Sequence, residues 1–137
     1  MNNLEGRLTE LSPYVLAILR IMTALLFMAH GTAKLFSFPD TGMSPPLFSL
    51  VGLAAVLEVI GGILLVLGLF TRPVAFILSG QMAVAYFMAH APQNFYPILN
   101  GGESAILFCF IFLYLVFAGA GAWSLDRHAT ARVNPAR

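Results

Sequence analysis

Residues 13–36 read PYVLAILRIMTALLFMAHGTAKLF, and this stretch decides the fold. A helix that crosses a bilayer needs roughly 20 mainly apolar residues to bridge about 30 Å of hydrocarbon. At about 1.5 Å per residue, this stretch forms a helix of about 36 Å, which is long enough. Mostly polar residues precede it and no small-residue cleavage site follows. It is therefore predicted to be a membrane span and not a cleaved signal peptide.

Three more stretches have the length and composition of membrane spans. Leu, Ala and Phe are frequent in them, and they lack the alternating ten-residue segments of barrel strands. They are residues 47–70, 73–90 and 104–123. The sequence therefore predicts an all-α fold, an integral membrane four-helix bundle over residues 13–123.

Residues at the ends of these stretches support the boundaries. Ser12 and Pro13 are typical of an N-cap and a first helical position, so the first helix is expected to begin there. Thr-Arg-Pro at residues 71–73 is expected to form a tight turn between the second and third spans. The two longer loops, residues 37–46 and 91–102, are rich in Pro, Gly and Asn.

The composition excludes several classes of protein. Hydrophobic residues make up 59% of the chain and charged residues only 9%, whereas a soluble domain carries about a quarter charged residues. Lipid must therefore solvate most of the surface. A net charge of +1 without a basic run gives no sign of a nucleic-acid partner. The single cysteine, Cys109, excludes an intramolecular disulfide, and no Cys/His spacing predicts a metal site.

The basic residues outside the spans predict the orientation. The two longer loops contain no Lys or Arg, whereas the other three connecting or terminal segments do. Cytoplasmic segments of membrane proteins carry the excess of such residues. We therefore predict that residues 1–12, the turn after the second span and the tail 124–137 are cytoplasmic. The arginines concerned are Arg7, Arg72, Arg127, Arg132 and Arg137.

Polar residues inside the spans are the candidates for function. Arg20, Thr23, Phe27, His30 and Lys34 are spaced three or four residues apart, so they share one stripe of the first helix. A charged side chain in the middle of a bilayer costs at least about 2.5–3.5 kcal/mol to insert. These groups are therefore expected to face other helices.

Glu58 lies in the middle of the second span, and Gln81 in the middle of the third. Judged by depth alone, Glu58 is expected to form an intramembrane ion pair with Arg20. The pair either fixes the register of two helices or takes part in function, and the sequence leaves both readings open.

A second group is expected near the outer face. His30, Lys34 and His90 fall at that end of their spans, Asn100 lies in the adjoining loop and Glu103 at the start of the fourth span, and all five are predicted to bind a ligand together. His30 and Glu103 are the candidate catalytic residues because both can transfer protons. The alternative is a salt-bridged lid without a cavity beneath it.

Several blocks of residues follow a known pattern. They are Arg20…His30-Gly31…Lys34-Leu35, Glu58-x-x-Gly61-Gly62, Gly68-Leu69-x-Thr71-Arg72, His90 with Asn100-Gly101-Gly102-Glu103, and Gly121-x-Trp123-Ser124-Leu125-Asp126. In these blocks, from about Leu16 to Asp126, the chain resembles the DoxX family of small bacterial membrane proteins. The resemblance implies a four-helix membrane bundle in a bacterial inner membrane.

The resemblance also suggests a function. The family is named for a subunit of an archaeal thiosulfate:quinone oxidoreductase, and other members are implicated in quinone, catechol or thiol stress. We therefore expect a membrane redox accessory, or oxidoreductase subunit, that binds a quinone or a similar lipophilic aromatic ligand near the periplasmic face. His30 and Lys34 would donate hydrogen bonds to its carbonyl groups, and Glu103 with His90 would relay protons.

Other readings stay open at this point. The sequence has no dithiol and no recognisable nucleotide or flavin loop, so electrons would have to come from elsewhere. A haem between His30 and His90 is conceivable but disfavoured, since the two histidines differ in depth. The first alternative function is a non-catalytic structural or assembly subunit of a larger membrane complex, and the second is a small transporter or proton-coupled channel. The protein is expected to act either as a homo-oligomer or as a subunit of a membrane redox complex.

Overall fold

The computed structural model describes residues 3–133, and every regular element in this range is helical. The predicted all-α fold is confirmed. Arg137 and the outermost residues of the predicted terminal segments lie outside the described range. The elements are α1 (Asn3–Phe36), α2 (Leu50–Leu67), α3 (Thr71–Ala85), the π-helical turn η1 (Tyr86–His90), α4 (Pro97–Asn100), α5 (Glu103–Ala118) and α6 (Leu125–Val133).

Three of the helices are long and apolar enough to cross a membrane: α1, α2 and the continuous segment Thr71–His90. The fourth, α5, is equally apolar but has only 16 residues. Large apolar side chains cover the outside of these helices, for example Leu26 at 59% and Phe110 at 64% exposure. Such a surface is stable only in lipid. The chain is a multi-pass membrane protein.

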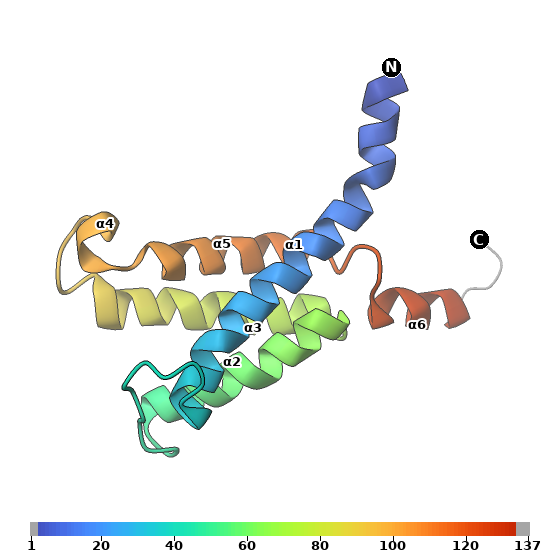
Figure 1. Ribbon diagram of the computed structural model, residues 1–137. Helices are drawn as coiled ribbons and strands as arrows, with labels where there is room; N and C mark the ends of the chain where they lie inside the picture. The colour runs from blue at the N-terminus through green and yellow to red at the C-terminus, as the bar shows by residue number, and fades with distance from the viewer. Residues whose placement is uncertain (1–2, 134–137) are drawn as a thin grey trace.

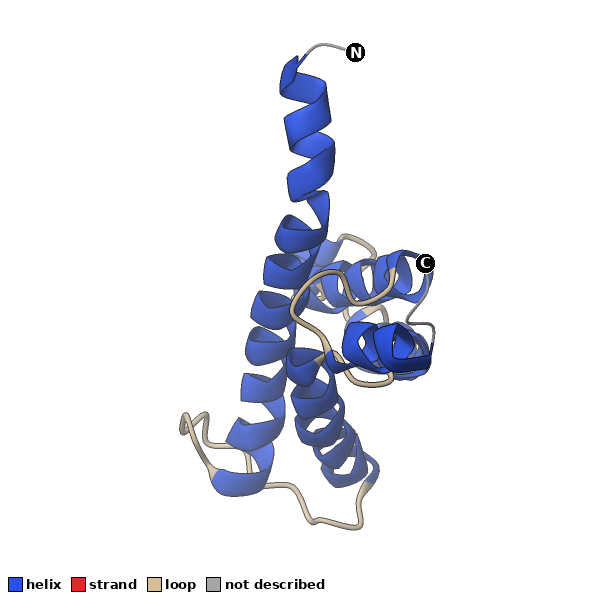
Figure 2. Cartoon of the chain, turned by 90° about the vertical axis from the view of Figure 1, so that its right-hand side faces the viewer, coloured by secondary structure: helices blue, strands red, loops and turns tan. Residues whose placement is uncertain are grey.

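The four long helices form two hairpins that cross each other (Figure 1). Helix α1 packs mainly on α2, and α3 packs mainly on α5. The short turn between α2 and α3 joins the two hairpins. Residues 119–124 lie at the same end of the molecule, which we call the arginine-rich end. Residues 37–49 and the segment 91–102, which contains α4, lie at the opposite end, which we call the loop end. Figure 2 shows α1 extending well beyond the other helices.

The core lies where the two hairpins cross. Phe27 of α1 is buried there, with its ring edge-on to Phe112 of α5 at a centroid distance of 4.9 Å. Glycines bring the backbones close: a Cβ on Gly61 would meet the Leu78 side chain at 2.9 Å. The buried apolar residues of this core are Ala24, Phe27, Leu65, Ala75, Leu78, Met82, Phe112 and Leu115.

Helix α1 begins earlier than the sequence predicted. It runs from Asn3 straight through Pro13, so Ser12 is not its N-cap. The Leu, Glu and Arg residues upstream are strong helix formers, and they continue the helix although Pro13 removes one hydrogen bond and crowds the carbonyl four residues before it. Pro13 also contacts the segment after α5, because its carbonyl oxygen accepts a hydrogen bond from the N–H of Ala122 (2.9 Å).

Two other predicted boundaries were wrong. The turn after α2 consists of residues 68–70, and Thr71 already begins α3. Gly68 ends α2 in the left-handed region (φ 65°), and Pro73 fits into the first turn of α3, where N–H groups lack helical acceptors. The helix of the fourth predicted span, α5, ends at Ala118 and not at residue 123, because Gly119 (φ 80°) and Gly121 (φ 73°) adopt positive φ angles.

Candidate functional site

The register between α1 and α2 decides which polar residues meet. A Cβ on Gly31 would lie 2.8 Å from the Ala55 carbonyl oxygen and 2.9 Å from the Cβ of Glu58. Three residues further along α1 is Lys34. Because helical side chains lean toward the N-terminus of their helix, the Lys34 side chain reaches back to the level of Glu58.

Lys34 and Glu58 form a bidentate ion pair. The Nζ atom of Lys34 donates to Oε1 and Oε2 of Glu58, at 2.9 and 3.0 Å. The Glu58 side chain is 4% exposed and that of Lys34 is 18% exposed. An ion pair removed from water to this extent depends on good geometry to offset the loss of hydration.

Gln81 of α3 joins this ion pair to the second hairpin. Its Nε2 atom lies 3.3 Å from the Ala54 carbonyl oxygen and 3.4 Å from Oε1 of Glu58. Its own carbonyl oxygen, Oε1, is buried and has no hydrogen-bond partner in the described part of the chain. We call Lys34, Glu58 and Gln81 the Lys34–Glu58 group.

The predicted ion pair between Arg20 and Glu58 was wrong. In the α1–α2 register, Arg20 faces Gly68, where a Cβ would lie 3.1 Å from the guanidinium carbon. Gly68 is ten residues beyond Glu58, which corresponds to about 15 Å along a helix. Depth estimated from the ends of each predicted span was too coarse to detect this offset.

Arg20 instead binds backbone carbonyls and is completely buried. Its Nη1 atom donates to the carbonyl oxygens of Ala120 and Ala122, and its Nη2 atom donates to that of Trp123 at 2.9 Å. These carbonyls belong to the segment after α5, which has no helical donors for them. Arg20 therefore holds residues 119–124 against α1.

Two further charged residues secure the arginine-rich end. Arg72 Nη1 donates to the carbonyls of Val116 and Phe117, both at 2.7 Å, at the C-terminus of α5. The Asp126 carboxylate accepts from the N–H groups of Phe70 (2.8 Å) and Thr71 (2.9 Å), at the N-terminus of α3. Each charge has the sign that the helix dipole favours at that position.

At the loop end, His90 and Asn100 form a separate group. The Nδ1–H of His90 donates to the Asn100 carbonyl oxygen (3.0 Å). The Asn100 side chain donates to the Asn94 carbonyl (2.9 Å) and to the Tyr86 hydroxyl (3.3 Å), and accepts from the N–H of Gly102 (2.7 Å). These bonds shape the loop before α5. No ligand contact tests the binding role predicted for His90 and Asn100, and on these bonds we give the two residues a structural role in the loop.

The remaining two predicted site residues lie apart from these groups. The exposed His30 ring packs edge-on to Phe108 of α5 at a centroid distance of 5.9 Å. The exposed Glu103 carboxylate forms no hydrogen bond or ion pair within residues 3–133. Lys34, which was predicted to lie beside Glu103, is paired with Glu58 instead. The predicted outer cluster is thus divided, with His30 and Lys34 one turn apart on α1.

The sequence reasoning missed the roles of three residues. Gln81 was noted only as a polar residue in mid-span, Arg72 only for the orientation and the family pattern, and Asp126 only as part of that pattern. The sequence did carry a signal for Arg72 and Asp126. Each lies in a block that also contains glycine and a predicted helix boundary, where a charged side chain can bind the free backbone groups of a helix end. No sequence signal indicates that Gln81 contacts Glu58, because this contact depends on how the two hairpins cross.

Comparison with known proteins agrees with this architecture. Residues 15–91, more than half of the chain, match the model of the DoxX family. The chain is 49% identical over 135 residues to an uncharacterized protein of Haemophilus influenzae, covering 92% of this chain and 96% of that protein. It is 27% identical over 139 residues to an uncharacterized membrane protein of Mycobacterium tuberculosis, covering 88% and 83%.

A third relative carries a location in its name. Inner membrane protein YphA of Escherichia coli is 32% identical over 127 residues, which cover 84% of this chain and 90% of that protein. No solved structure matches the chain. With its long apolar helices, the family match and these relatives, the chain is a multi-pass bacterial inner membrane protein of the DoxX family.

Proposed function

We propose that this protein binds a quinone or a similar lipophilic aromatic ligand within the membrane, as an accessory subunit of a redox enzyme. The observation that carries the proposal is the unpaired, buried carbonyl of Gln81 beside the Lys34–Glu58 ion pair. Buried polar atoms nearly always have a partner, and those without one are frequent at functional sites. Residues 3–133 offer this oxygen no hydrogen-bond donor, and a ligand hydroxyl could donate to it.

The same place offers donors as well as an acceptor. Two hydrogen bonds occupy two of the three ammonium hydrogens of Lys34, so one remains for a ligand. His30, one turn away on α1, is exposed beside the ring of Phe108. A quinone carbonyl accepts from such groups, and a quinol hydroxyl donates to Gln81. We propose His30, Lys34 and Gln81 as the ligand-binding residues.

Proton transfer is the chemistry that these side chains can supply. Reduction of a quinone to a quinol takes up two electrons and two protons. His30 can deliver protons from the exposed side, and Glu58 holds the Lys34 ammonium in place beside the ligand. The electrons would come from a partner enzyme, since a single cysteine cannot form a dithiol.

Replacement of His30 by glutamine is expected to weaken the binding of a ubiquinone analogue about fivefold. Glutamine still carries an N–H donor, but it loses the titratable imidazole and places the donor differently from the ring N–H, and one well-aligned hydrogen bond is worth about 1 kcal/mol. Equilibrium dialysis of the purified protein in detergent against ubiquinone-1 measures this change directly.

His90→Gln is the matched control, because this second histidine follows an identical Phe-Met-Ala sequence. Its ring is bonded to the loop carbonyl of Asn100, so binding is expected to stay within twofold of that of the parent protein. No binding by the parent protein, or equal losses in both variants, would contradict the proposed site and favour a non-catalytic assembly subunit.

We further propose that both termini are cytoplasmic, with the arginine-rich end facing the cytoplasm. Single cysteines at Gly6 and Ala129 in a Cys109→Ala background are expected to be protected from an impermeant maleimide in intact spheroplasts. Cysteines at Thr41 and Gln93 are expected to react. The basis is the absence of Lys and Arg from the two loops at the loop end. Labelling of both Gly6 and Ala129 from outside would reverse the orientation.

A further inference from the structure

A cavity of about 510 Å³ lies at the arginine-rich end, between the start of α3, the end of α5 and α6. This volume is within the range of small-molecule binding pockets, about 300–1,000 Å³. The cavity is lined by Thr71, Arg72, Asp126, Arg127 and Thr130, together with the backbone of residues 118–121. The proposed quinone site lies elsewhere, among the helices, so this cavity needs an explanation of its own.

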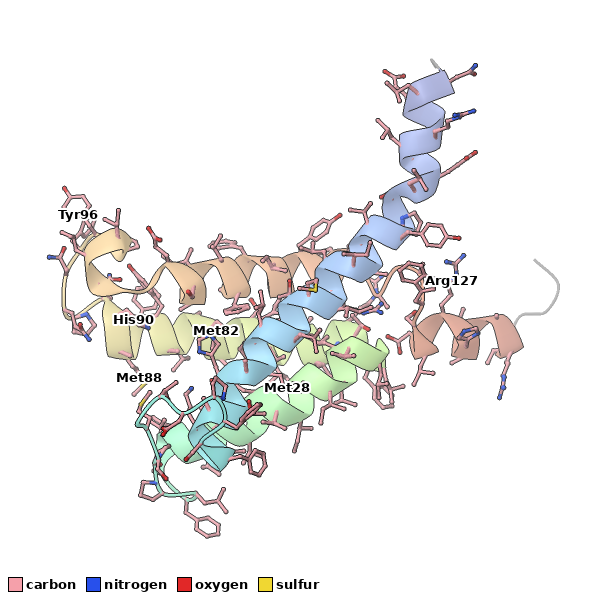
Figure 3. The ribbon with its side chains drawn as sticks, viewed as in Figure 1. Met28, Met82, Met88, His90, Tyr96 and Arg127 are labelled. Atoms are coloured by element: carbon pink, nitrogen blue, oxygen red, sulfur yellow. The ribbon has the colours of Figure 1, made fainter. Side chains whose placement is uncertain are left out.

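Two arginines line the cavity. Arg127 is exposed, and its guanidinium makes no hydrogen bond or ion pair within the described range. Arg72 uses its Nη1 atom for the carbonyls at the end of α5, which leaves Nη2 and Nε without a protein acceptor there. Arginine presents paired N–H groups that match the oxygen atoms of a phosphate. Figure 3 shows Arg127 at the end of the molecule opposite His90.

The one acidic residue lining the cavity does not cancel this charge. Both carboxylate oxygens of Asp126 are occupied by the N–H groups of Phe70 and Thr71. One carboxylate against Arg72 and Arg127 leaves an excess positive charge. The cavity therefore favours an anion over a cation.

A buried hydroxyl supplies an independent sign of a missing ligand. Thr71 is 1% exposed and lines the cavity, yet its Oγ1 atom has no hydrogen-bond partner among residues 3–133. The other threonine in the wall, Thr130, donates to the Asp126 carbonyl oxygen at 3.0 Å. A buried hydroxyl without a partner is costly, and a phosphate oxygen would accept its proton.

We propose that this cavity binds the phosphate group of an anionic ligand through Arg72, Arg127 and Thr71. Two sources share this chemistry: the headgroup of an anionic phospholipid in the adjoining leaflet, and a soluble phosphate ester. Trp123 is exposed and precedes Ser124 of the cavity wall, and tryptophan is favoured at the lipid interface, which supports the phospholipid as one source.

The test uses the full-length protein in a neutral detergent. Short-chain phosphatidylglycerol, phosphatidylcholine and glycerol 3-phosphate are titrated separately, and binding is followed by native mass spectrometry and by the change in Tm. Arg127→Gln is expected to weaken binding of the preferred anion about tenfold, as for the loss of one charge-assisted contact. Thr71→Val, which removes only the unpaired hydroxyl, is expected to weaken it several-fold without lowering the Tm of the free protein.

Arg132→Gln is the matched control, because Arg132 lies on the same helix but does not line the cavity. It should bind within twofold of the parent protein. Binding of phosphatidylglycerol that depends on Arg127 identifies a lipid site, whereas Arg127-dependent binding of glycerol 3-phosphate alone identifies a soluble ligand; both support the proposal. Equal effects of Arg127→Gln and Arg132→Gln, or equal binding of phosphatidylcholine and phosphatidylglycerol, or no binding of any probe, would overturn it.

Discussion

Replacing Glu58 by leucine is expected to lower the free energy of unfolding by about 3 kcal/mol. The change leaves the Lys34 ammonium without its bidentate partner, and removing one member of a buried ion pair typically costs about 3–5 kcal/mol. The lower end of that range applies because the Lys34 side chain is 18% exposed and can turn toward the loop end. Unfolding in mixtures of a mild detergent and SDS measures the loss.

Glu103→Gln is the control for this prediction. Glu103 also carries a carboxylate at the loop end but is exposed and unpaired among the described residues. Its removal costs only the interaction with the N-terminus of α5, about 0.3–1 kcal/mol. Equal effects of Glu58→Leu and Glu103→Gln would mean that the ion pair contributes nothing to stability.

Replacing Arg20 by methionine is expected to be at least as damaging, at about 3–5 kcal/mol. The guanidinium is fully buried and satisfies the carbonyls of Ala120, Ala122 and Trp123. Each buried acceptor left unsatisfied costs about 1–3 kcal/mol, and relaxation of the chain reduces the sum. Arg20→Lys is expected to recover only part of the loss, because an ammonium lacks the planar fork that spans three acceptors.

Proteolysis gives this prediction a local readout. Once Arg20 no longer holds residues 119–124, cleavage after Trp123 should become faster in the folded Arg20→Met variant. Arg7→Met, a change at an exposed arginine of the same helix, should alter stability by less than about 0.5 kcal/mol and leave cleavage unchanged. A stable Arg20→Met variant with an unchanged cleavage rate would contradict the role given to Arg20.

The sequence predicted the helices well because the bilayer imposes a simple rule on length and hydrophobicity. It predicted their ends less well. Pro13 lies inside α1, and the apolar stretch continuing to residue 123 conceals a helix end at Ala118. That end depends on Arg20 and Arg72, which donate hydrogen bonds to carbonyl groups at and beyond the end of α5, far from both arginines in the sequence. No local pattern shows such a contact.

The candidate site was predicted only in part. Spacing correctly placed Arg20, Phe27 and Lys34 on the face of α1 that meets other helices, because helical periodicity is a local property. Spacing along one helix did not predict which residues these side chains contact on other helices. Glu58 meets Lys34 and not Arg20, since the close approach at Gly31 sets the register of α1 on α2. Gln81 reaches the pair only because α3 crosses α2 at that level.

The measurement that tests the account most directly compares two double-mutant cycles on the free energy of unfolding. One cycle combines Glu58→Leu with Lys34→Met, and the other combines Glu58→Leu with Arg20→Met. Residues in one ion pair show interaction energies of about 0.5–3 kcal/mol, whereas distant residues are additive within about 0.3–0.5 kcal/mol. We expect a coupling of about 2 kcal/mol between Glu58 and Lys34, and additivity between Glu58 and Arg20. Strong coupling of Glu58 to Arg20 with additivity toward Lys34 would contradict the helix register and the ligand site built on it.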